Sequence, residues 1–524
     1  MLNWKTSMAI VALAGALYGC QPPADQTVTP ETLKKIGAIS PRFQSYNVEM
    51  IEVTGGKFWR PYASTAEKKP DGAKSDGPIE GLDPNLYEYR QPIDLSNPRL
   101  RMLAAALGPA YMRVSGTWAN ATYLPEEGEE IVLKPDGYDG ILTRQQWQGV
   151  VEFSKAVDAE ITTSFAVSTG TRGTDKVWKS DQAQRLVNLT KSLGGQIAAA
   201  EFMNEPNFVD LTKAPEGYSA ADYGRDFDIF QKWIKAASPE TLVLGPGSVG
   251  ESGITPFMLW LTGVNVADSA DMLSSSKQTV DGFSYHHYGA LSRRCRESGF
   301  GSTDYDSAFT EDWLSRTDDS AETYEELRDE YAKGANMWLT ETGEAACGGN
   351  PWAATFADSF RYLDQMGRLA KRGTYVVMHN TLAASDYALL EETDFAPRPS
   401  YWAALLWTKL MGTTVLGAGT SQSDHVKLYA HCHKDIKGGV TLLAINIDRE
   451  NSHDLALSQG GMRYTLTAPK IDGKVVRLNG ETLALQDETL PVFKPVQMAD
   501  STLALGPASI SFVAFPNAGN QQCK

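Results

Sequence analysis

Two glutamates stand where apolar, strand-like runs of the sequence end. Glu205 follows the run 198–203 within Asn204-Glu205-Pro206, and Glu341 closes the run 337–341. Cleavage of a glycosidic bond needs one carboxylic acid to protonate the leaving oxygen and one carboxylate to attack or stabilise the anomeric carbon. Such a pair therefore indicates a glycosidase. Carboxyl groups ~5 Å apart would retain the anomeric configuration, and a wider gap would admit water and invert it.

Other polar residues near these ends have simpler interpretations. An Asn-Glu-Pro tripeptide alone is weak evidence, and the second glutamate, three repeat units later, gives it weight. Glu344 lies three residues past Glu341, and we expect it to face solvent in a loop. His286 and His287 are expected to hydrogen-bond neighbours at a strand end. We predict no metal and no cofactor.

The elements that must position the glutamates follow from the pattern of the chain. Helical patterns such as 180–193 and 355–371 separate most of the apolar runs. Eight strands alternating with helices predict an α/β fold, a (β/α)8 barrel, whose chemistry lies at the carboxyl ends of the strands. The expected strands are 47–53, 110–114, 161–167, 198–203, 242–245, 282–287, 337–341 and 375–378.

The chain is long enough for a second domain, since its 524 residues are 42% hydrophobic and include 12 Trp. After about Gly412 the helical periodicity stops and alternating strands follow. We therefore assign residues 46–411 to the catalytic barrel and 412–524 to a C-terminal β-sandwich. The net charge of -16 disfavours a nucleic-acid partner.

The N-terminal residues are typical of an export signal. Lys5 precedes the apolar run 8–17, which is too short to span a bilayer. Leu17-Tyr18-Gly19-Cys20 is similar to a bacterial lipobox, so we expect residues 1–20 to be a signal with Cys20 lipidated and 21–30 to be a tether. The alternative is a plain cleaved signal. The expected location is the periplasm or the outer membrane of a bacterium, with the lipid as the only membrane contact.

Four cysteines remain after Cys20, and an exported chain would oxidise them. Cys432 and Cys523 lie at the two ends of the last segment, whereas Cys295 and Cys347 lie in polar or glycine-rich loops. We expect these two bridges, and no cysteine spacing resembles a zinc site.

Several blocks, in order, resemble glycoside hydrolase family 79, the heparanases and β-glucuronidases, and suggest a single-chain bacterial member. They are LRMLAAALGPAYMRVSGT (100–117), NEPN (204–207), YHHY (285–288), WLTET (338–342) and YW (401–402), and the similarity continues through the last domain. The resemblance implies a retaining mechanism, with Glu205 as acid/base and Glu341 as nucleophile. It also implies that residues 31–45 add a strand to the sandwich and that Cys432 bridges Cys523.

The resemblance further implies a set of substrate-binding residues. Tyr288 would hydrogen-bond the nucleophile, and Asn204 would hold the sugar 2-hydroxyl or the nucleophile. The carboxylate of a glucuronate would meet the backbone amides of Gly348 and Gly349 and the hydroxyl of Tyr387, although a tight turn would also explain the glycines. The remaining sugar hydroxyls would meet Glu52, Thr117 and Asn380.

The leading hypothesis is hydrolysis of terminal β-linked glucuronic acid from a glycan or glycoconjugate by double displacement. A second hypothesis is an endo-β-glucuronidase acting on uronic-acid polysaccharides, and the loops 64–85 and 292–312 decide between them. A third hypothesis is a non-catalytic glycan-binding lipoprotein, and a fourth is a glucosidase or xylanase. The only basic cluster near the site is Arg293, Arg294 and Arg296, which could equally be a solvated loop.

Overall fold

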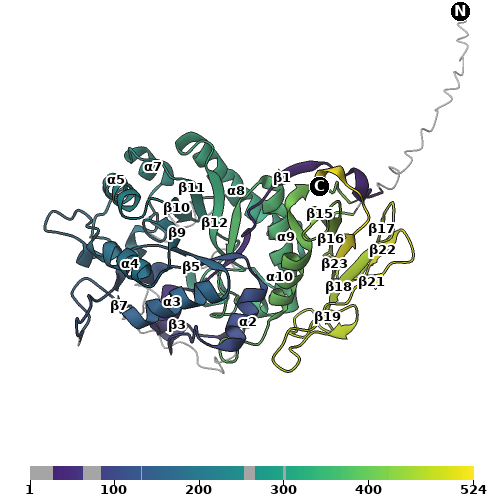
Figure 1. Ribbon diagram of the computed structural model, residues 1–524, viewed down its shortest axis with the longest axis horizontal. Helices are drawn as coiled ribbons and strands as arrows, with labels where there is room; N and C mark the ends of the chain where they lie inside the picture. The colour runs from purple at the N-terminus through teal and green to yellow at the C-terminus, as the bar shows by residue number, and fades with distance from the viewer. Residues whose placement is uncertain (1–26, 63–83, 132, 253–265, 299–302, 422) are drawn as a thin grey trace, which may run out of the picture.

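The computed structural model describes residues 27–62, 84–131, 133–252, 266–298, 303–421 and 423–524 (Figure 1). Cys20, most of the tether 21–30 and most of the loop 64–85 lie outside the described residues. Among the described helices, none combines the length and the apolar composition that a membrane span requires.

Eight parallel strands close into a barrel, which confirms the main prediction of fold. Strands of this kind are covered on both faces, so they read as continuous apolar runs. The strand Ala110–Val114, for example, is buried at every position. In barrel order the strands are β2 (Gln44–Asn47), β5 (Ala110–Val114), β8 (Ala159–Thr163), β9 (Ile197–Glu201), β10 (Leu242–Val249), β11 (Gly282–Tyr288), β12 (Asn336–Gly343) and β13 (Val376–His379).

Helices surround this barrel, and local capping fixes several of their ends. In α3, Thr143 and Gln146 form a reciprocal capping box. The helix α9 ends where Gly373 takes a left-handed conformation that glycine adopts without strain. The helices are α2 (Pro98–Ala106), α3 (Arg144–Ala156), α4 (Asp181–Ser192), α5 (Ala220–Ala237), α7 (Ser269–Ser275), α8 (Glu311–Tyr331), α9 (Phe356–Arg372) and α10 (Pro399–Leu410).

The expected first strand, 47–53, is wrong in its bounds. Strand β2 ends at Asn47, and the short helix α1 (Met50–Thr54) follows it. The carboxylate of Glu52 accepts a hydrogen bond from the backbone N–H of Glu49 at 2.7 Å, which closes the first helical turn. After α1 the chain forms a hairpin of β3 (Gly56–Trp59) and β4 (Tyr87–Arg90), and the pair β6 (Thr122–Tyr123) and β7 (Gly140–Ile141) follows β5.

The C-terminal region is the expected β-sandwich. A nine-stranded sheet packs on the two-stranded sheet of β17 (His453–Ala456) and β22 (Thr502–Leu505), with apolar side chains such as Leu442 and Leu503 between them. The large sheet contains β1 (Lys35–Ala38), β14 (Met411–Leu416), β15 (Val426–His433), β16 (Val440–Asn446), β18 (Met462–Thr467), β19 (Arg477–Leu478), β20 (Glu481–Thr482), β21 (Val496–Gln497) and β23 (Ser509–Phe515). In Figure 1, α9 and α10 lie between barrel and sheet.

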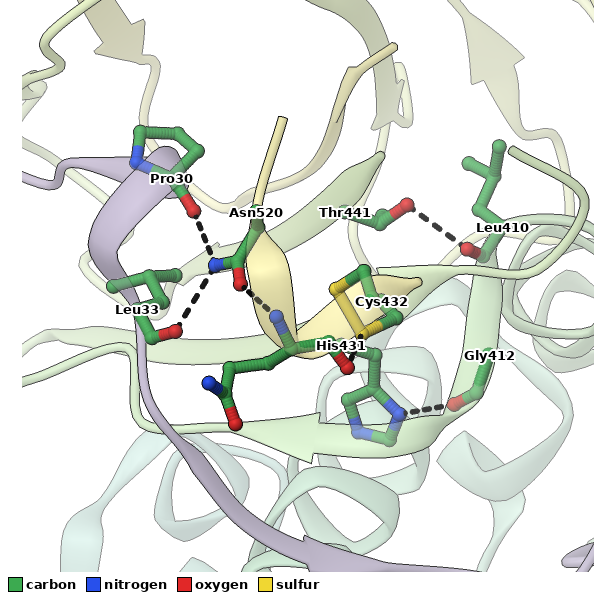
Figure 2. The surroundings of a disulfide bond; sticks show 10 residues. Pro30, Leu33, Leu410, Gly412, His431, Cys432, Thr441 and Asn520 are labelled. Atoms are coloured by element: carbon green, nitrogen blue, oxygen red, sulfur yellow. Dashed lines mark hydrogen bonds between the residues drawn. A yellow bond between two sulfur atoms is a disulfide. The ribbon is translucent and has the colours of Figure 1, made fainter. Parts of the chain in front are cut away.

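The N-terminal segment joins this second domain, as the sequence predicted. Strand β1 pairs antiparallel with β14 at the edge of the large sheet. Figure 2 shows that Asn520 donates from its side-chain nitrogen to the carbonyl oxygens of Pro30 at 2.7 Å and Leu33 at 3.0 Å. The bridge between Cys432 and Cys523 lies beside these bonds.

The second bridge lies in the barrel and joins two loops of its mouth. Cys295, in the loop after β11, is bonded to Cys347, in the loop after β12. Both disulfide pairs expected from the sequence are therefore formed.

Candidate active site

The two glutamates meet at the carboxyl ends of the fourth and seventh barrel strands. Glu205 lies just beyond β9, with a left-handed φ of 47°, and Glu341 lies within β12. One oxygen of each carboxyl group and one ring nitrogen of His286 all lie within 4.8 Å of one another. The side chains of Glu205 and Glu341 are 16% and 9% exposed, so a substrate can reach both.

Arg113, on β5, is the charged centre beneath them. Its guanidinium donates to Glu201 at 3.0 Å, to Glu341 Oε2 at 2.9 Å and to the side-chain oxygen of Asn204 at 2.8 Å. Burial raises the pKa of Glu201, but the Arg113 charge together with hydrogen bonds, among them one from Thr340, lowers this pKa overall. Arg113 therefore supplies the countercharge beside Glu341 and fixes the position of Asn204.

Asn204 is held on its backbone as well as on its side chain. Asn120 accepts from the Asn204 backbone N–H at 2.9 Å and donates to its carbonyl oxygen at 2.9 Å. With its side-chain oxygen bound to Arg113, Asn204 presents its amide nitrogen as the remaining donor. Such a donor suits a sugar hydroxyl, and the role that the resemblance gave Asn204 stays a prediction.

A chain of hydrogen bonds leads from Glu341 to the far side of the site. Tyr288 donates its hydroxyl to Glu341 Oε1 at 2.7 Å, as expected from the sequence. Asn380 donates from its side-chain nitrogen to the hydroxyls of Tyr288 at 2.9 Å and Tyr387 at 3.1 Å. Burial raises the pKa of both tyrosines well above the ordinary value, so both hydroxyls keep their protons.

Glu205 is poised to carry a proton, because burial raises its pKa to about 7. Its partner is His286, whose Nδ1 lies 3.1 Å from Glu205 Oε1 and whose Nε2 lies 3.2 Å from Arg113 Nη2. Burial lowers the pKa of His286 to about 4, so the ring is neutral. Since arginine can only donate, Nε2 must accept, and Nδ1 carries the hydrogen and donates to Oε1.

Two consequences follow from this arrangement of His286. The mobile proton of Glu205 belongs on Oε2, because Oε1 is occupied as an acceptor.

In the described part of the chain, Glu205, His286 and Glu341 are the one group with metal-ligand geometry. The hydrogen on Nδ1 and the Arg113 charge both oppose a cation there. His287, its neighbour, bonds Ser320 at 2.7 Å, as a strand-end histidine was expected to do.

Glu49 is a site residue that the sequence analysis missed. It lies between β2 and α1 with its carboxyl group against Gly116, where no side chain would fit. Burial, then the charge of Glu341, raises the pKa of Glu49 well above its ordinary value. Glu52, which had been expected at a strand end, instead lies in α1 and binds the Glu49 backbone. Of the two, Glu49 is the carboxyl group that faces Glu341.

Thr117 and the glycine turn lie at the rim of the site. Thr117 begins the short 3-10 helix Thr117–Ala121 directly after β5 and Gly116, and it is half-buried. Cys347, Gly348 and Gly349 are left-handed in succession, with φ of 62°, 79° and 81°. The Gly349 N–H donates to the carbonyl of Ala345 at 3.2 Å, so only the Gly348 amide of the expected pair is left without a partner among the described residues.

The expectation that Glu344 faces solvent is wrong. Its side chain is buried and accepts two hydrogen bonds from Asn350, from the backbone N–H at 2.7 Å and from the side chain at 2.9 Å. Burial raises the pKa of Glu344 to about 8. The side chain of Glu344 therefore stabilises the loop after β12 by binding Asn350 inside it.

The arginines after β11 differ from one another. Arg293 is exposed, as expected for a solvated loop, whereas the side chain of Arg294 is only 5% exposed. The side chain of Arg296 lies outside the described part of the structure.

Two of the residues that sequence reasoning missed share one signal. Arg113 and Glu201 are the single charges of the apolar strands AYMRV and IAAAE, whereas Glu49 lies two residues past the end of β2 and carries no such signal. A lone charge in a strand buried on both faces requires a partner inside the barrel.

Known proteins are similar to this chain in sequence and in fold. A model described as glycosyl hydrolase family 79, N-terminal domain, matches residues 93–367. Heparanase from Bos taurus is 29% identical over 502 residues, covering 84% of this chain and 87% of the relative. Baicalin-beta-D-glucuronidase from Scutellaria baicalensis is 35% identical over 192 residues, 35% and 36% of the two chains.

A solved structure gives the same result for the fold. The GH51 alpha-L-arabinofuranosidase from Thermotoga petrophila RKU-1 superposes with a TM-score of 0.61 and 14% identity, over 93% of this chain and 99% of its own.

Proposed function

Since the chain belongs to glycoside hydrolase family 79, it is a glycosidase, and we propose that it releases terminal β-linked glucuronic acid from glycans or glycoconjugates with retention of configuration. In this proposal Glu205 is the acid/base and Glu341 the nucleophile. Carbohydrate is the partner, and no cofactor takes part.

The observation that carries the mechanism is the distance between the two carboxyl groups. Retaining enzymes hold them ~5–5.5 Å apart, whereas inverting enzymes leave ~6.5–9.5 Å for a water molecule. One oxygen of Glu205 and one oxygen of Glu341 lie within 4.8 Å of each other here. That spacing favours direct attack by Glu341 over attack by an intervening water.

The contacts of each glutamate suit one role. Glu205, with its raised pKa, gives the proton on Oε2 to the leaving oxygen, while Glu341 attacks the anomeric carbon. Arg113 and Tyr288 hold one oxygen of Glu341 each, which orients the carboxylate. In the second step Glu205, now ionised, takes a proton from water, and the released hydroxide oxygen bonds to the anomeric carbon as Glu341 leaves.

The choice of a glucuronide rests on the other side of the site. The Gly348 amide and the Tyr387 hydroxyl are uncharged donors that can bind a carboxylate. A relative with similarity over part of the chain is named a beta-D-glucuronidase, which supports the same substrate class. Both donors can also bind a neutral hydroxyl group, but a carboxylate accepts stronger, charge-assisted hydrogen bonds from them.

The test is release of p-nitrophenol from its β-D-glucuronide, with the β-glucoside and the β-galactoside as controls. Wild type should act on the glucuronide, and Glu205→Gln and Glu341→Gln should each lose most of that activity. Proton NMR should show the β-anomer of glucuronic acid as the first product. Release of the α-anomer would refute retention, and equal rates on all three glycosides would refute the substrate class.

The alternative is an endo-acting enzyme, and the similarity to bovine heparanase supports it. It would shorten uronic-acid polysaccharides while leaving the small glucuronide intact. Viscometry of a polymeric substrate distinguishes the two, since only internal cleavage lowers viscosity early in the reaction.

For location, we propose a lipoprotein anchored through Cys20. The support is the lipobox-like sequence that ends in this residue. Expression of the full chain in a bacterium should place it in the membrane fraction, and Cys20→Ser should release it. An unchanged distribution in the variant would refute the anchor.

A further inference from the structure

One guanidinium group lies directly beside the glycine turn that borders the site. A β-carbon at position 348 would come within 3.1 Å of Arg294 Nη1, so the Arg294 guanidinium packs against the backbone of Gly348. The disulfide explains why: Cys295, the residue after Arg294, is bonded to Cys347, the residue before Gly348. The two loops are therefore joined covalently at this point.

Further contacts fix the orientation of Arg294. Its Nη2 donates to Asp386 Oδ2 at 2.5 Å, and its Nη1 donates to the carbonyl oxygen of Arg60 at 2.8 Å. The guanidinium also stacks on the ring of Tyr62, with its carbon 4.2 Å from the ring centroid. Arginine held in this way is preorganised, because little side-chain entropy is left to lose on binding.

One donor of this group is left over. The side chain of Arg294 is 5% exposed, yet its Nε is buried with no hydrogen-bond partner among the described residues. A buried donor without a partner costs free energy, and a polar ligand or water would remove that cost. The Gly348 amide next to it also lacks a described partner.

We propose that Arg294 is the specificity-determining cation of the sugar site, and that it draws the carboxylate of a glucuronate to the Gly348 amide and the Tyr387 hydroxyl. The inference rests on the proposed function and adds a charge partner to it. Tyr387 follows Asp386 directly in the chain, so the ion pair lies next to the tyrosine. Asp386 pairs with Arg294, which explains how the cation can be buried.

The charge of Arg294 has an effect that differs from that of the neutral donors. Tyr387 and Gly348 are neutral donors and would accept a hydroxymethyl group as well, whereas the charge of Arg294 favours an anion only. Loss of this charge should therefore weaken binding of glucuronides and leave binding of glucosides nearly unchanged. Since Arg294 touches neither Glu205 nor Glu341 in the described contacts, kcat should change little.

The experiment compares Arg294→Gln, Arg294→Lys and the control Arg293→Gln, which removes one charge from the exposed neighbouring side chain. With p-nitrophenyl β-D-glucuronide, Arg294→Gln should raise KM on the order of tenfold and leave kcat within about threefold, as expected for one lost charged contact. Arg294→Lys should fall between Arg294→Gln and wild type, and Arg293→Gln should match wild type. Thermal unfolding verifies that each variant is folded.

A second readout is competitive inhibition by glucuronic acid and by glucose. Arg294→Gln should weaken inhibition by glucuronic acid alone, and an equal loss for both sugars would overturn the inference in favour of a structural role. An unchanged KM in Arg294→Gln, or an equal rise in Arg293→Gln, would also overturn it while the proposed function stands. Wild type that ignores every glucuronide would overturn the proposed function, and this inference with it.

Discussion

Replacing Tyr288 by Phe removes one hydroxyl and tests how the carboxylate of Glu341, the proposed nucleophile, is held. The hydroxyl donates to Glu341 Oε1 at 2.7 Å in a buried setting, so it is a hydrogen bond to a charged group. Such bonds contribute about 1.5–3 kcal/mol. At ~1.36 kcal/mol per factor of ten, kcat/KM should fall roughly 10- to 150-fold.

The neighbouring hydrogen bonds should survive this substitution. After the substitution the side-chain nitrogen of Asn380 still donates to Tyr387 at 3.1 Å, so that donor keeps a partner. The other oxygen of Glu341 keeps its bond to Arg113. The loss should therefore come from Glu341 Oε1 and not from a collapse of the site.

The assay is initial-rate kinetics on p-nitrophenyl β-D-glucuronide, with Tyr387→Phe as the matched control. Tyr387→Phe removes the same atom from a ring 6.3 Å away that makes no contact with Glu341 among the described hydrogen bonds. It should raise KM and change kcat by only a few-fold. If Tyr288→Phe retains more than about a third of the wild-type kcat/KM, or if both variants lose kcat equally, the reasoning is refuted.

Three further predictions concern the proton, the buried charge and a bridge. Because Glu205 has a pKa of about 7 and must be protonated to act, kcat/KM should fall as pH rises above about 7, and a profile flat to pH 9 would contradict this role. Arg113→Met leaves Glu201 and Glu341 buried without their cation, so denaturant unfolding should show a loss of about 3–5 kcal/mol, and a loss under 1 kcal/mol would count against it. Replacing both Cys432 and Cys523 by Ser removes a disulfide that spans a sequence separation of 91 residues, so thermal unfolding should show a loss of about 4–5 kcal/mol in the free energy of unfolding. KM should stay unchanged, and a shifted KM would show that the second domain shapes the site.

The barrel could be predicted because its strands carry a strong one-dimensional signal. Strands covered on both faces are apolar throughout, as in 110–114, and polar residues mark the end at which chemistry occurs. The first strand was harder. Residues 47–53 are a short apolar run that either a strand or a helical turn could accommodate, and the bond between Glu49 and Glu52 decides for the helix.

Pairs of charges could not be predicted in the same way. Arg113 and Glu201 each stand out as a charge in an apolar strand, but 88 positions separate them in the sequence. They come together because β5 and β9 pair with opposite edges of β8, which brings both charges onto the same interior face. A charge that needs a partner can be recognised from sequence, whereas the identity of that partner depends on tertiary structure.

Loops were the least predictable part. Glu344 was expected in solvent because it follows Glu341 by three residues in a glycine-rich segment. The loop folds back, and Asn350 takes up the carboxyl group with two donors. No periodicity in a sequence reports such a reversal, because it depends on the contacts that the loop makes with itself.

The entry of the chain through β1 has a mechanical consequence. A pulling force on the N-terminal end would first load the backbone hydrogen bonds of Val28 with Ala456 and Ser458, and then those from Asn520 to Pro30 and Leu33 and those between β1 and β14. The first barrel strand begins only at Gln44, beyond these bonds. The hydrogen bonds that hold the N-terminal segment on the second domain would thus break before any force reached the strands that carry Glu205 and Glu341.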